Sequence, residues 1–212
     1  MRTLAVVLIA AAAWAQPAPP AARRHSPAER YELFKNNLRL RAEAISRRQF
    51  EGITSLEDWK RRRPEIRRQF LDMLGLDPMP PRTPLNARVT GSFERQGYRV
   101  ENIVLESRPK LYVTGNLYLP AARPGAGRAP AIVYVSGHAP GPAGTKAHYQ
   151  HHGIWFARNG FAAFVLDTIE FAEIPGIHHG VHDLAMWHWL SLGYTPAGVE
   201  VWNALRALDY LE

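Results

Sequence analysis

Two short apolar runs, separated by a Gly-rich turn and a helix-forming segment, constrain the fold of this chain more than any other feature. Residues 131–135 and 161–166 are unbroken apolar runs rich in β-branched or aromatic side chains, which is typical of strands buried on both faces of a parallel sheet. Three glycines and two prolines in residues 137–144 end the first run, and residues 146–158 are expected to form a helix. The pattern predicts a β-α-β unit.

The Gly-rich turn is the first candidate for a functional site. In an open parallel sheet, ligands bind beyond the carboxyl ends of the strands. A Gly-rich turn in that position leaves backbone N–H groups free to bind an anion or a developing oxyanion. We therefore expect chemistry at the end of the first apolar run.

Three further strands are predicted before this unit. Residues 88–94, 98–106 and 111–119 read as successive antiparallel strands, with turns between them that contain glycine or proline. In the third strand apolar residues alternate with more polar ones, so one face of that strand is expected to be buried. Together with the parallel unit, these strands predict an α/β fold.

Residues 26–84 are predicted to form a helical extension and a Pro-rich connector. Ser26-Pro27-Ala28-Glu29 is a capping box with proline at the first helical position, and its helix is expected to run to about Arg48. A second helix is expected from Ser55 to Gly75. Its basic side chains in residues 60–68 are interleaved with acidic ones, which indicates a solvated helix face and no nucleic-acid partner.

The first 15 residues have the pattern of a cleaved secretory signal peptide. Arg2 precedes a short apolar run, and Ala13-Trp14-Ala15 is a small-residue cleavage site. The run is shorter than the roughly 20 residues that span a bilayer, and a chain without cysteine carries no thiol-linked lipid. We expect cleavage after Ala15, a linker over residues 16–25, and a secreted or periplasmic protein with no stable membrane anchor.

Composition limits the chemistry further. Of the 212 residues 46% are hydrophobic, which is typical of a globular chain with one core. The absence of cysteine excludes disulfides, thiolate metal sites and a thiol nucleophile. The net charge of +7 favours acidic partners at long range without identifying one.

Four local phrases, in the order in which they occur, point to a family. They are LGL at 74–76, PRTPL at 81–85, TGNLYLP at 114–120 and GYTPAG at 193–198. With the order of predicted elements, they resemble the first half of an α/β-hydrolase, and within that superfamily the secreted acetyl xylan esterase-like hydrolases. The resemblance implies an incomplete α/β-hydrolase sheet in residues 85–212, antiparallel strands leading into a parallel unit, and no cofactor.

The resemblance also implies where the oxyanion is held. The family pattern places an oxyanion-hole donor on the residue after a His-Gly pair that ends the third strand. The matching pair here is Ser136-Gly137, so the backbone N–H groups of His138 and Ala139 are the implied donors. Four residues that follow the second buried run are expected to line the substrate pocket: Asp167, Glu170, His178 and His179. For Asp167 and Glu170, bracing of the loop stays open as the alternative.

The catalytic triad is not expected within the 212 residues. Hydrolases of this kind carry the nucleophilic serine in a Gly-x-Ser-x-Gly elbow after a later strand, with the acid and the histidine following it. The position of that elbow falls beyond Glu212. We therefore expect the sequence to be the N-terminal portion of a larger enzyme, truncated before the nucleophile and inactive by itself.

Other residue groups leave alternatives open. Five residues form the densest group of potential metal ligands: His178, His179, His182, Asp183 and His188. Zinc binding, pocket lining and loop packing are all compatible with it, and packing or pocket lining is favoured over metal. Trp187, Trp189 and Trp202 suit either sugar stacking or the core, and their spacing favours the core.

The sequence thus predicts a secreted serine hydrolase that acts on a small ester or an acylated polysaccharide. A prolyl-oligopeptidase-like peptidase has the same visible features and remains an alternative. A non-catalytic metal- or carbohydrate-binding protein, built around the His- and Trp-rich segment, is the second alternative. The oligomeric state is not predicted.

Overall fold

The computed structural model describes residues 25–121, 127–137, 143–167, 169, 173 and 188–212. The chain divides into two compact units, Met1–Asp58 and Trp59–Glu212. The predicted signal peptide and most of the predicted linker lie outside the described residues. None of the helices in the described ranges is long and apolar enough to span a bilayer.

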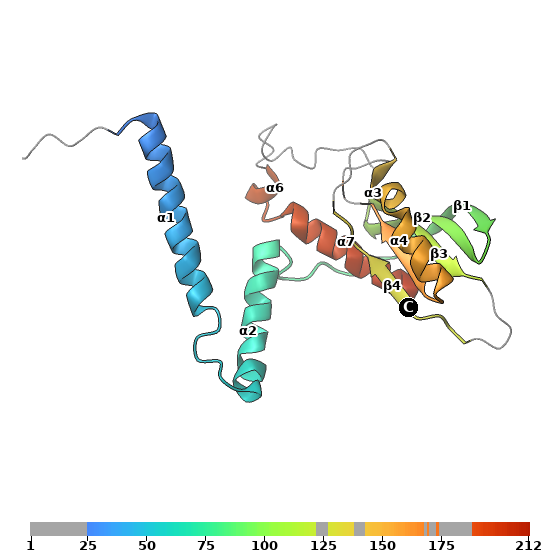
Figure 1. Ribbon diagram of the computed structural model, residues 1–212, viewed down its shortest axis with the longest axis horizontal. Helices are drawn as coiled ribbons and strands as arrows, with labels where there is room; N and C mark the ends of the chain where they lie inside the picture. Colours follow the sequence, from blue (N-terminus) through green and yellow to red (C-terminus); the bar gives the residue numbers. More distant parts are fainter. Residues whose placement is uncertain (1–24, 122–126, 138–142, 168, 170–172, 174–187) are drawn as a thin grey trace, which may run out of the picture. The chain divides into compact units, whose positions relative to one another are not determined.

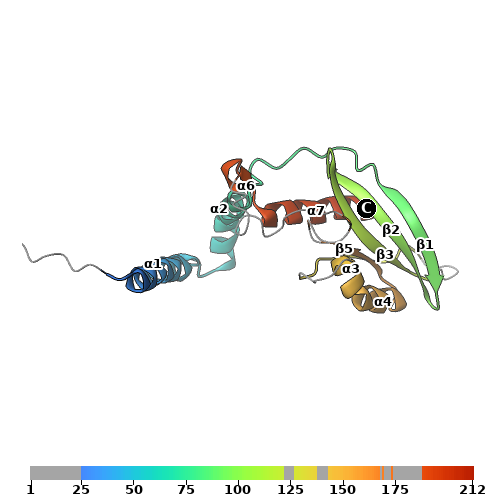
Figure 2. The same ribbon diagram turned by 90° about the horizontal axis from the view of Figure 1, so that it is seen from above.

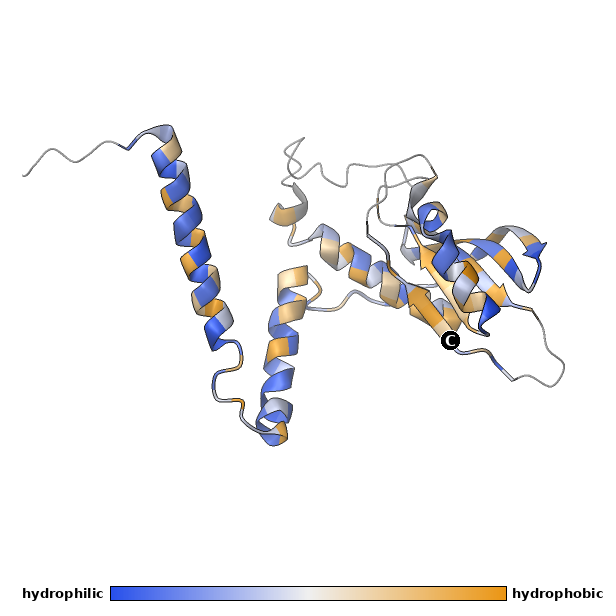
Figure 3. Cartoon of the chain, in the orientation of Figure 1, coloured by the Kyte–Doolittle hydropathy of each residue, from blue (hydrophilic) through white to orange (hydrophobic). Residues whose placement is uncertain are grey.

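Helix α1 (Pro27–Arg48) begins where the capping box predicts. The Ser26 hydroxyl accepts a hydrogen bond from the Glu29 N–H at 3.2 Å, and the Ser26 N–H donates to the Glu29 carboxylate at 2.8 Å. These two bonds satisfy N–H groups that a helix start leaves without partners. No residue of α1 is buried within its unit, and Figure 3 shows hydrophobic residues scattered along a mostly hydrophilic helix.

Helix α2 (Leu56–Leu74) ends in a Schellman motif. The N–H of Leu76 donates to the Leu71 carbonyl at 2.8 Å and the N–H of Gly75 donates to the Asp72 carbonyl at 2.9 Å. Gly75 has φ +70°, a backbone conformation that is sterically costly for residues with a Cβ. The predicted end of the helix at Gly75 is confirmed.

Among the described residues, five strands form one mixed sheet (Figure 1). Strands β1 (Arg88–Arg95), β2 (Tyr98–Arg108) and β3 (Leu111–Pro120) are antiparallel neighbours, as predicted. Strands β4 (Ala131–Tyr134) and β5 (Ala162–Leu166) are parallel to each other, which confirms the predicted β-α-β unit. The strand order is β1-β2-β3-β5-β4, and β5 runs antiparallel to β3.

The connection from β4 to β5 contains two short helices where the sequence predicts one. Helix α3 (Gly144–His148) and helix α4 (Gln150–Arg158) are separated at Tyr149, which lies outside helical geometry at φ −97°, ψ 16°. In the part of the chain that the structure describes, two further helices follow β5. They are α6 (His188–Ser191) and α7 (Pro196–Leu211).

Helices cover both faces of the sheet, and β5 supplies side chains to both cores. Phe164 and Leu166 of β5 pack in a cluster that includes Ala207 of α7. Ala163 and Val165 point to the other face and pack with Ala157 of α4. Figure 2 shows α7 on one side of the sheet and α3 with α4 on the other. The alternation explains why every residue of β5 is apolar, because both of its faces are buried.

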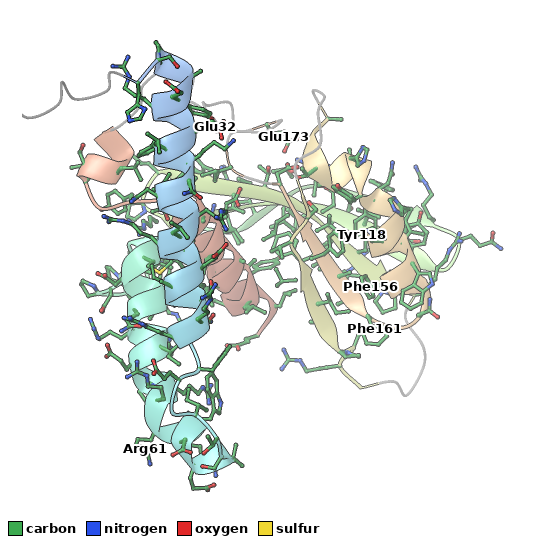
Figure 4. All side chains as sticks on the ribbon, turned by 60° about the vertical axis from the view of Figure 1, so that its left-hand side comes forward. Glu32, Arg61, Tyr118, Phe156, Phe161 and Glu173 are labelled. Atoms are coloured by element: carbon green, nitrogen blue, oxygen red, sulfur yellow. The ribbon has the colours of Figure 1, made fainter. Side chains whose placement is uncertain are left out.

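Aromatic residues gather on the face of the sheet that α4 covers. Tyr118, Phe156 and Phe161 are labelled in Figure 4 on this side of the sheet. The rings of Phe156 and Phe161 meet edge to face with centroids 6.2 Å apart. Burial raises the pKa of the Tyr118 phenol above its ordinary value, because a phenolate in this core would lose its hydration.

Strand β4 departs from the expectation of burial on both faces. Ala131 is exposed and Ile132, Val133 and Tyr134 are only half-buried, and Val135 directly after the strand is 67% exposed. The reason is its place in the sheet: β4 pairs with β5 along one side, and no strand of the described ranges pairs with its other side. Figure 3 shows β4 as hydrophobic, so an apolar strand lies at the sheet edge.

The end of α2 packs tightly against the start of α7. The Thr195 hydroxyl caps α7 by accepting from the Gly198 N–H at 2.9 Å and donates to the Leu74 carbonyl at 3.0 Å. A Cβ at Gly198 would lie 1.9 Å from the Leu74 oxygen, and one at Gly75 would lie 1.9 Å from the Gly193 oxygen. The phrases LGL and GYTPAG therefore form one contact between backbones.

Replacing Gly198 by alanine is expected to destabilise the protein. The added methyl group meets a backbone oxygen, which moves only if α2 and α7 separate, so the loss should reach or exceed the about 1–3 kcal/mol typical of overpacking. Urea denaturation measures it. Gly91→Ala is the matched control, because a Cβ at Gly91 meets nothing within 4 Å. Equal stability of the two variants would contradict the close approach of α2 and α7.

Candidate functional site

The carboxyl ends of β4 and β5 meet at one edge of the sheet, with the first turn of α3 beside them. Because the two strands are parallel and adjacent, the residues that follow them lie at the same end, where open sheets bind ligands. Gly144 has φ +74° and starts α3. Thr145, Lys146 and Asp167 are all buried here.

Asp167, the first residue after β5, is held by four groups. Its Oδ1 accepts from the Lys146 backbone N–H at 3.0 Å and lies 3.4 Å from the Thr145 hydroxyl, whose proton it shares with the Leu166 carbonyl at 3.3 Å. Its Oδ2 accepts from the Thr114 hydroxyl at 2.8 Å and from the Lys146 ammonium. The side chain of Asp167 is only 2% exposed. Such a carboxylate is stabilised as a charged group by its donors.

Lys146 completes this buried cluster, which we call the Lys146–Asp167 cluster and which comprises Thr114, Thr145, Lys146 and Asp167. The Lys146 ammonium pairs with Asp167, donates to the Thr114 hydroxyl at 3.4 Å and pairs with Glu173 at 2.7 Å. The Lys146 side chain is 8% exposed, whereas that of Glu173 is 59% exposed. Glu173 is labelled in Figure 4. The cluster joins β3, α3 and the residues that follow β5.

A second group of polar aromatic residues lies at the end of β4. The Tyr134 hydroxyl and His152 Nδ1 are 2.5 Å apart, and the Tyr149 ring stacks on the His152 ring with an interplanar angle of 14°. The Tyr149 hydroxyl would lie 3.6 Å from a Cβ at Gly137. Tyr149, at the junction of α3 and α4, therefore packs beside the start of the Gly-rich turn.

Of the residues predicted to form the site, only Asp167 lies in the described ranges. His138, Ala139, Glu170, His178 and His179 lie outside them, as do His182, Asp183 and Trp187. For Asp167 the structure reveals the bracing contacts, and its contact with substrate stays a prediction. Trp202 is 1% exposed, so its interpretation as a core residue is confirmed.

Sequence reasoning did not identify Lys146 or Thr114 as members of the site. A signal for Lys146 was present: it follows the Gly-rich turn after one buried strand, and Asp167 ends the other. Once the strands are placed side by side, the topology brings both charges to one end of the sheet. Thr114 gave no such signal, because it reaches the cluster only through the pairing of β3 with β5.

We assign no candidate site to the cavity at the opposite end of β4 and β5, and none to a metal ion. A cavity of about 800 Å³ is lined by residues such as Arg99, Pro130 and Gly160, at the ends where β4 and β5 begin, opposite to the carboxyl ends. Within the described residues, no group of three or more His, Asp or Glu side chains is arranged to hold a metal ion.

Comparison with known proteins supports the assignment of the fold. No protein-family model matches the sequence. No curated protein matches it. Among solved structures, a Bacteroides fragilis protein assigned as an acetyl xylan esterase superposes with a TM-score of 0.58 at 18% identity, over 74% of this chain and 44% of that one. The chain thus spans less than half of that protein's length.

Two further solved structures match less extensively. An acetyl xylan esterase from Paenibacillus sp. R4 has a TM-score of 0.38 at 17% identity, over 53% of this chain and 33% of that one. A cold-adapted esterase from an Arctic intertidal metagenomic library has a TM-score of 0.39 at 19% identity, over 61% of this chain and 50% of that one. The assignment rests on the Bacteroides fragilis structure: the chain has the fold of an esterase-like hydrolase.

Proposed function

We propose that these 212 residues carry the oxyanion-binding side of a secreted serine hydrolase that acts on carboxylic esters, with an acetyl ester of a polysaccharide or a similar small ester as substrate. The observation that carries the proposal is the carboxyl end of β4, which the Gly-rich sequence 137–144 follows and which lies beside the buried end of β5, in a chain with an esterase-like fold. The solved Bacteroides fragilis structure supports the substrate class through its own assignment.

In this proposal the nucleophile, the acid and the catalytic histidine lie outside the 212 residues. The apolar, half-buried edge of β4 supports the idea, because such an edge is suited to pairing with another parallel strand. A serine on that part of the protein attacks the ester carbonyl and the histidine takes the serine proton. The backbone N–H groups of His138 and Ala139 then donate to the oxyanion.

The other residues expected at the site take secondary roles in the same proposal. Glu170, His178 and His179 line the pocket for the acyl or alcohol portion of the substrate, whereas Asp167, with its side chain 2% exposed, braces α3 through Lys146. The hydrolase is exported after cleavage at Ala15. In this proposal residues 1–212 alone are inactive, because the serine that attacks the carbonyl lies outside them.

The experiment compares His138→Pro with His138→Ala in the full-length protein. Proline removes the backbone N–H whereas alanine keeps it, so only the proline variant should lose the oxyanion donor. We expect kcat for p-nitrophenyl acetate to fall by about 10²- to 10³-fold in His138→Pro and by a few-fold at most in His138→Ala. Acetate release from acetylated xylan tests the substrate class.

The same assays distinguish the alternatives. Equal activity of the two His138 variants would reject the amide of His138 as the donor. Cleavage of a proline-containing peptide by the full-length protein, without ester hydrolysis, would reject the esterase assignment in favour of a peptidase. Turnover by purified residues 1–212 would show that the nucleophile lies within them.

A further inference from the structure

We propose that Lys146 is a positioning residue, which holds the first turn of α3 against the carboxyl end of β5 and thereby sets Tyr149 beside Gly137. The inference rests on the proposed function, because it concerns the support of the turn assigned to the oxyanion. It adds a residue that neither the family resemblance nor the comparisons assign.

Lys146 binds the Asp167 carboxylate through both its backbone N–H and its side-chain ammonium. Its backbone N–H donates to Asp167 Oδ1 at 3.0 Å, and its ammonium pairs with Asp167 Oδ2. A residue held at the main chain and at the end of its side chain has few rotamers left. The α3 backbone at residue 146 is therefore tied directly to the end of β5.

Two further residues, Thr114 and Glu173, contact the Lys146–Asp167 ion pair, which we call the clamp. Thr114 of β3 contacts both charged groups, donating to Asp167 at 2.8 Å and lying 3.4 Å from the Lys146 ammonium. Glu173 binds the same ammonium at 2.7 Å from the exposed side. Strand β3 and the segment that follows β5, both distant from Lys146 in the sequence, thus meet on one lysine.

The buried ion pair of Lys146 and Asp167 contributes geometry more than stability. A buried ion pair is weak evidence for stability, because desolvation of both charges offsets their attraction, and apolar residues of the same size often serve as well. What the pair does supply is geometry, since charged hydrogen bonds are short and directional. A clamp of this kind suits a turn whose amides must point at one place.

Lys146 is linked to the start of the Gly-rich turn through Tyr149. Tyr149 follows Lys146 by three residues and caps the end of α3. Its hydroxyl packs beside Gly137, which follows β4. A shift of α3 along β5 would therefore move Tyr149 away from Gly137. The amides of residues 145–149 report such a shift.

The test is amide hydrogen exchange of the full-length protein with a charge-free pair, Lys146→Met/Asp167→Asn. Asparagine keeps an oxygen for the residue-146 N–H, so the fold is preserved while the ionic clamp is removed. We expect exchange at residues 145–149 to accelerate at least tenfold, with less than threefold change at the buried strand amides of Ile103 and Val113. Lys35→Met is the control, because Lys35 pairs with Glu32 on the exposed surface of α1.

Each outcome is decisive. Unchanged exchange at residues 145–149, or equal acceleration there and in the strands, would overturn the proposal, because the pair would then be dispensable or generally stabilising. If the double variant does not fold, Glu173→Gln replaces it, with a two- to fivefold acceleration confined to residues 145–149 expected and no change refuting the clamp. Ester hydrolysis by the wild-type protein is measured separately, so failure of the proposed function is recognised independently of the exchange result.

Discussion

Replacing Asp167 by alanine is expected to lower the free energy of unfolding by about 3–5 kcal/mol, the usual cost of leaving one partner of a buried ion pair alone. The variant removes the carboxylate that pairs with the buried Lys146 ammonium and accepts from Thr114 and Thr145. Glu173 remains, but it is 59% exposed and approaches Lys146 from the solvent side. Its screened charge compensates for only part of the loss.

Urea denaturation followed by tryptophan fluorescence measures the effect of Asp167→Ala. The matched control is Glu65→Ala, since Glu65 pairs at 3.1 Å with Arg68 and both side chains are exposed. A surface pair of this kind contributes about 0–1 kcal/mol. Comparable losses in the two variants would mean that the Lys146–Asp167 cluster is not buried as described.

Replacing Trp202 by alanine is expected to cost about 3–5 kcal/mol, as for other large aromatic side chains removed from a core. Trp202 of α7 is 1% exposed, and its indole N–H donates to the Ser107 carbonyl of β2 at 2.8 Å. The substitution leaves a cavity between α7 and the sheet. It also leaves a buried carbonyl without its donor, which adds to the loss.

Trp202→Phe separates these two contributions, because phenylalanine fills much of the volume and donates no hydrogen bond. We expect Trp202→Phe to lie between the wild type and Trp202→Ala in urea denaturation monitored by circular dichroism. Trp155→Ala is the control: Trp155 of α4 is 59% exposed, and its removal should cost less than about 1 kcal/mol. A neutral Trp202→Ala variant would contradict the packing of α7 on the sheet.

Local chemistry made most of the secondary structure predictable. Ser26 and Glu29 determine the start of α1 through hydrogen bonds within four residues, and the end of α2 follows from the conformational freedom of Gly75. The strands were recognised because alternation marks one buried face and an unbroken apolar run marks two. The run at 162–166 is buried throughout, as such a run indicates.

The misjudged features depend on neighbours that a local pattern does not identify. Residues 146–158 look like one helix, but packing around Tyr149 and His152 divides the segment into α3 and α4. The apolar run of β4 predicts two buried faces, yet its place at the edge of the described sheet leaves it half-exposed. An apolar run shows that a strand can be buried on both faces, whereas the position of the strand in the sheet determines how much of it is covered.

The sequence by itself determined most of the elements and the likeness to esterase-like hydrolases that the fold bears out. Only the tertiary structure decided that Thr114, Lys146 and Asp167 form one cluster, because their separations of 32 and 21 residues are closed by strand pairing and by the crossover of a parallel unit. Hydrogen bonds within a helical turn are encoded by adjacent residues. Bonds between distant residues exist only after the core has placed them together.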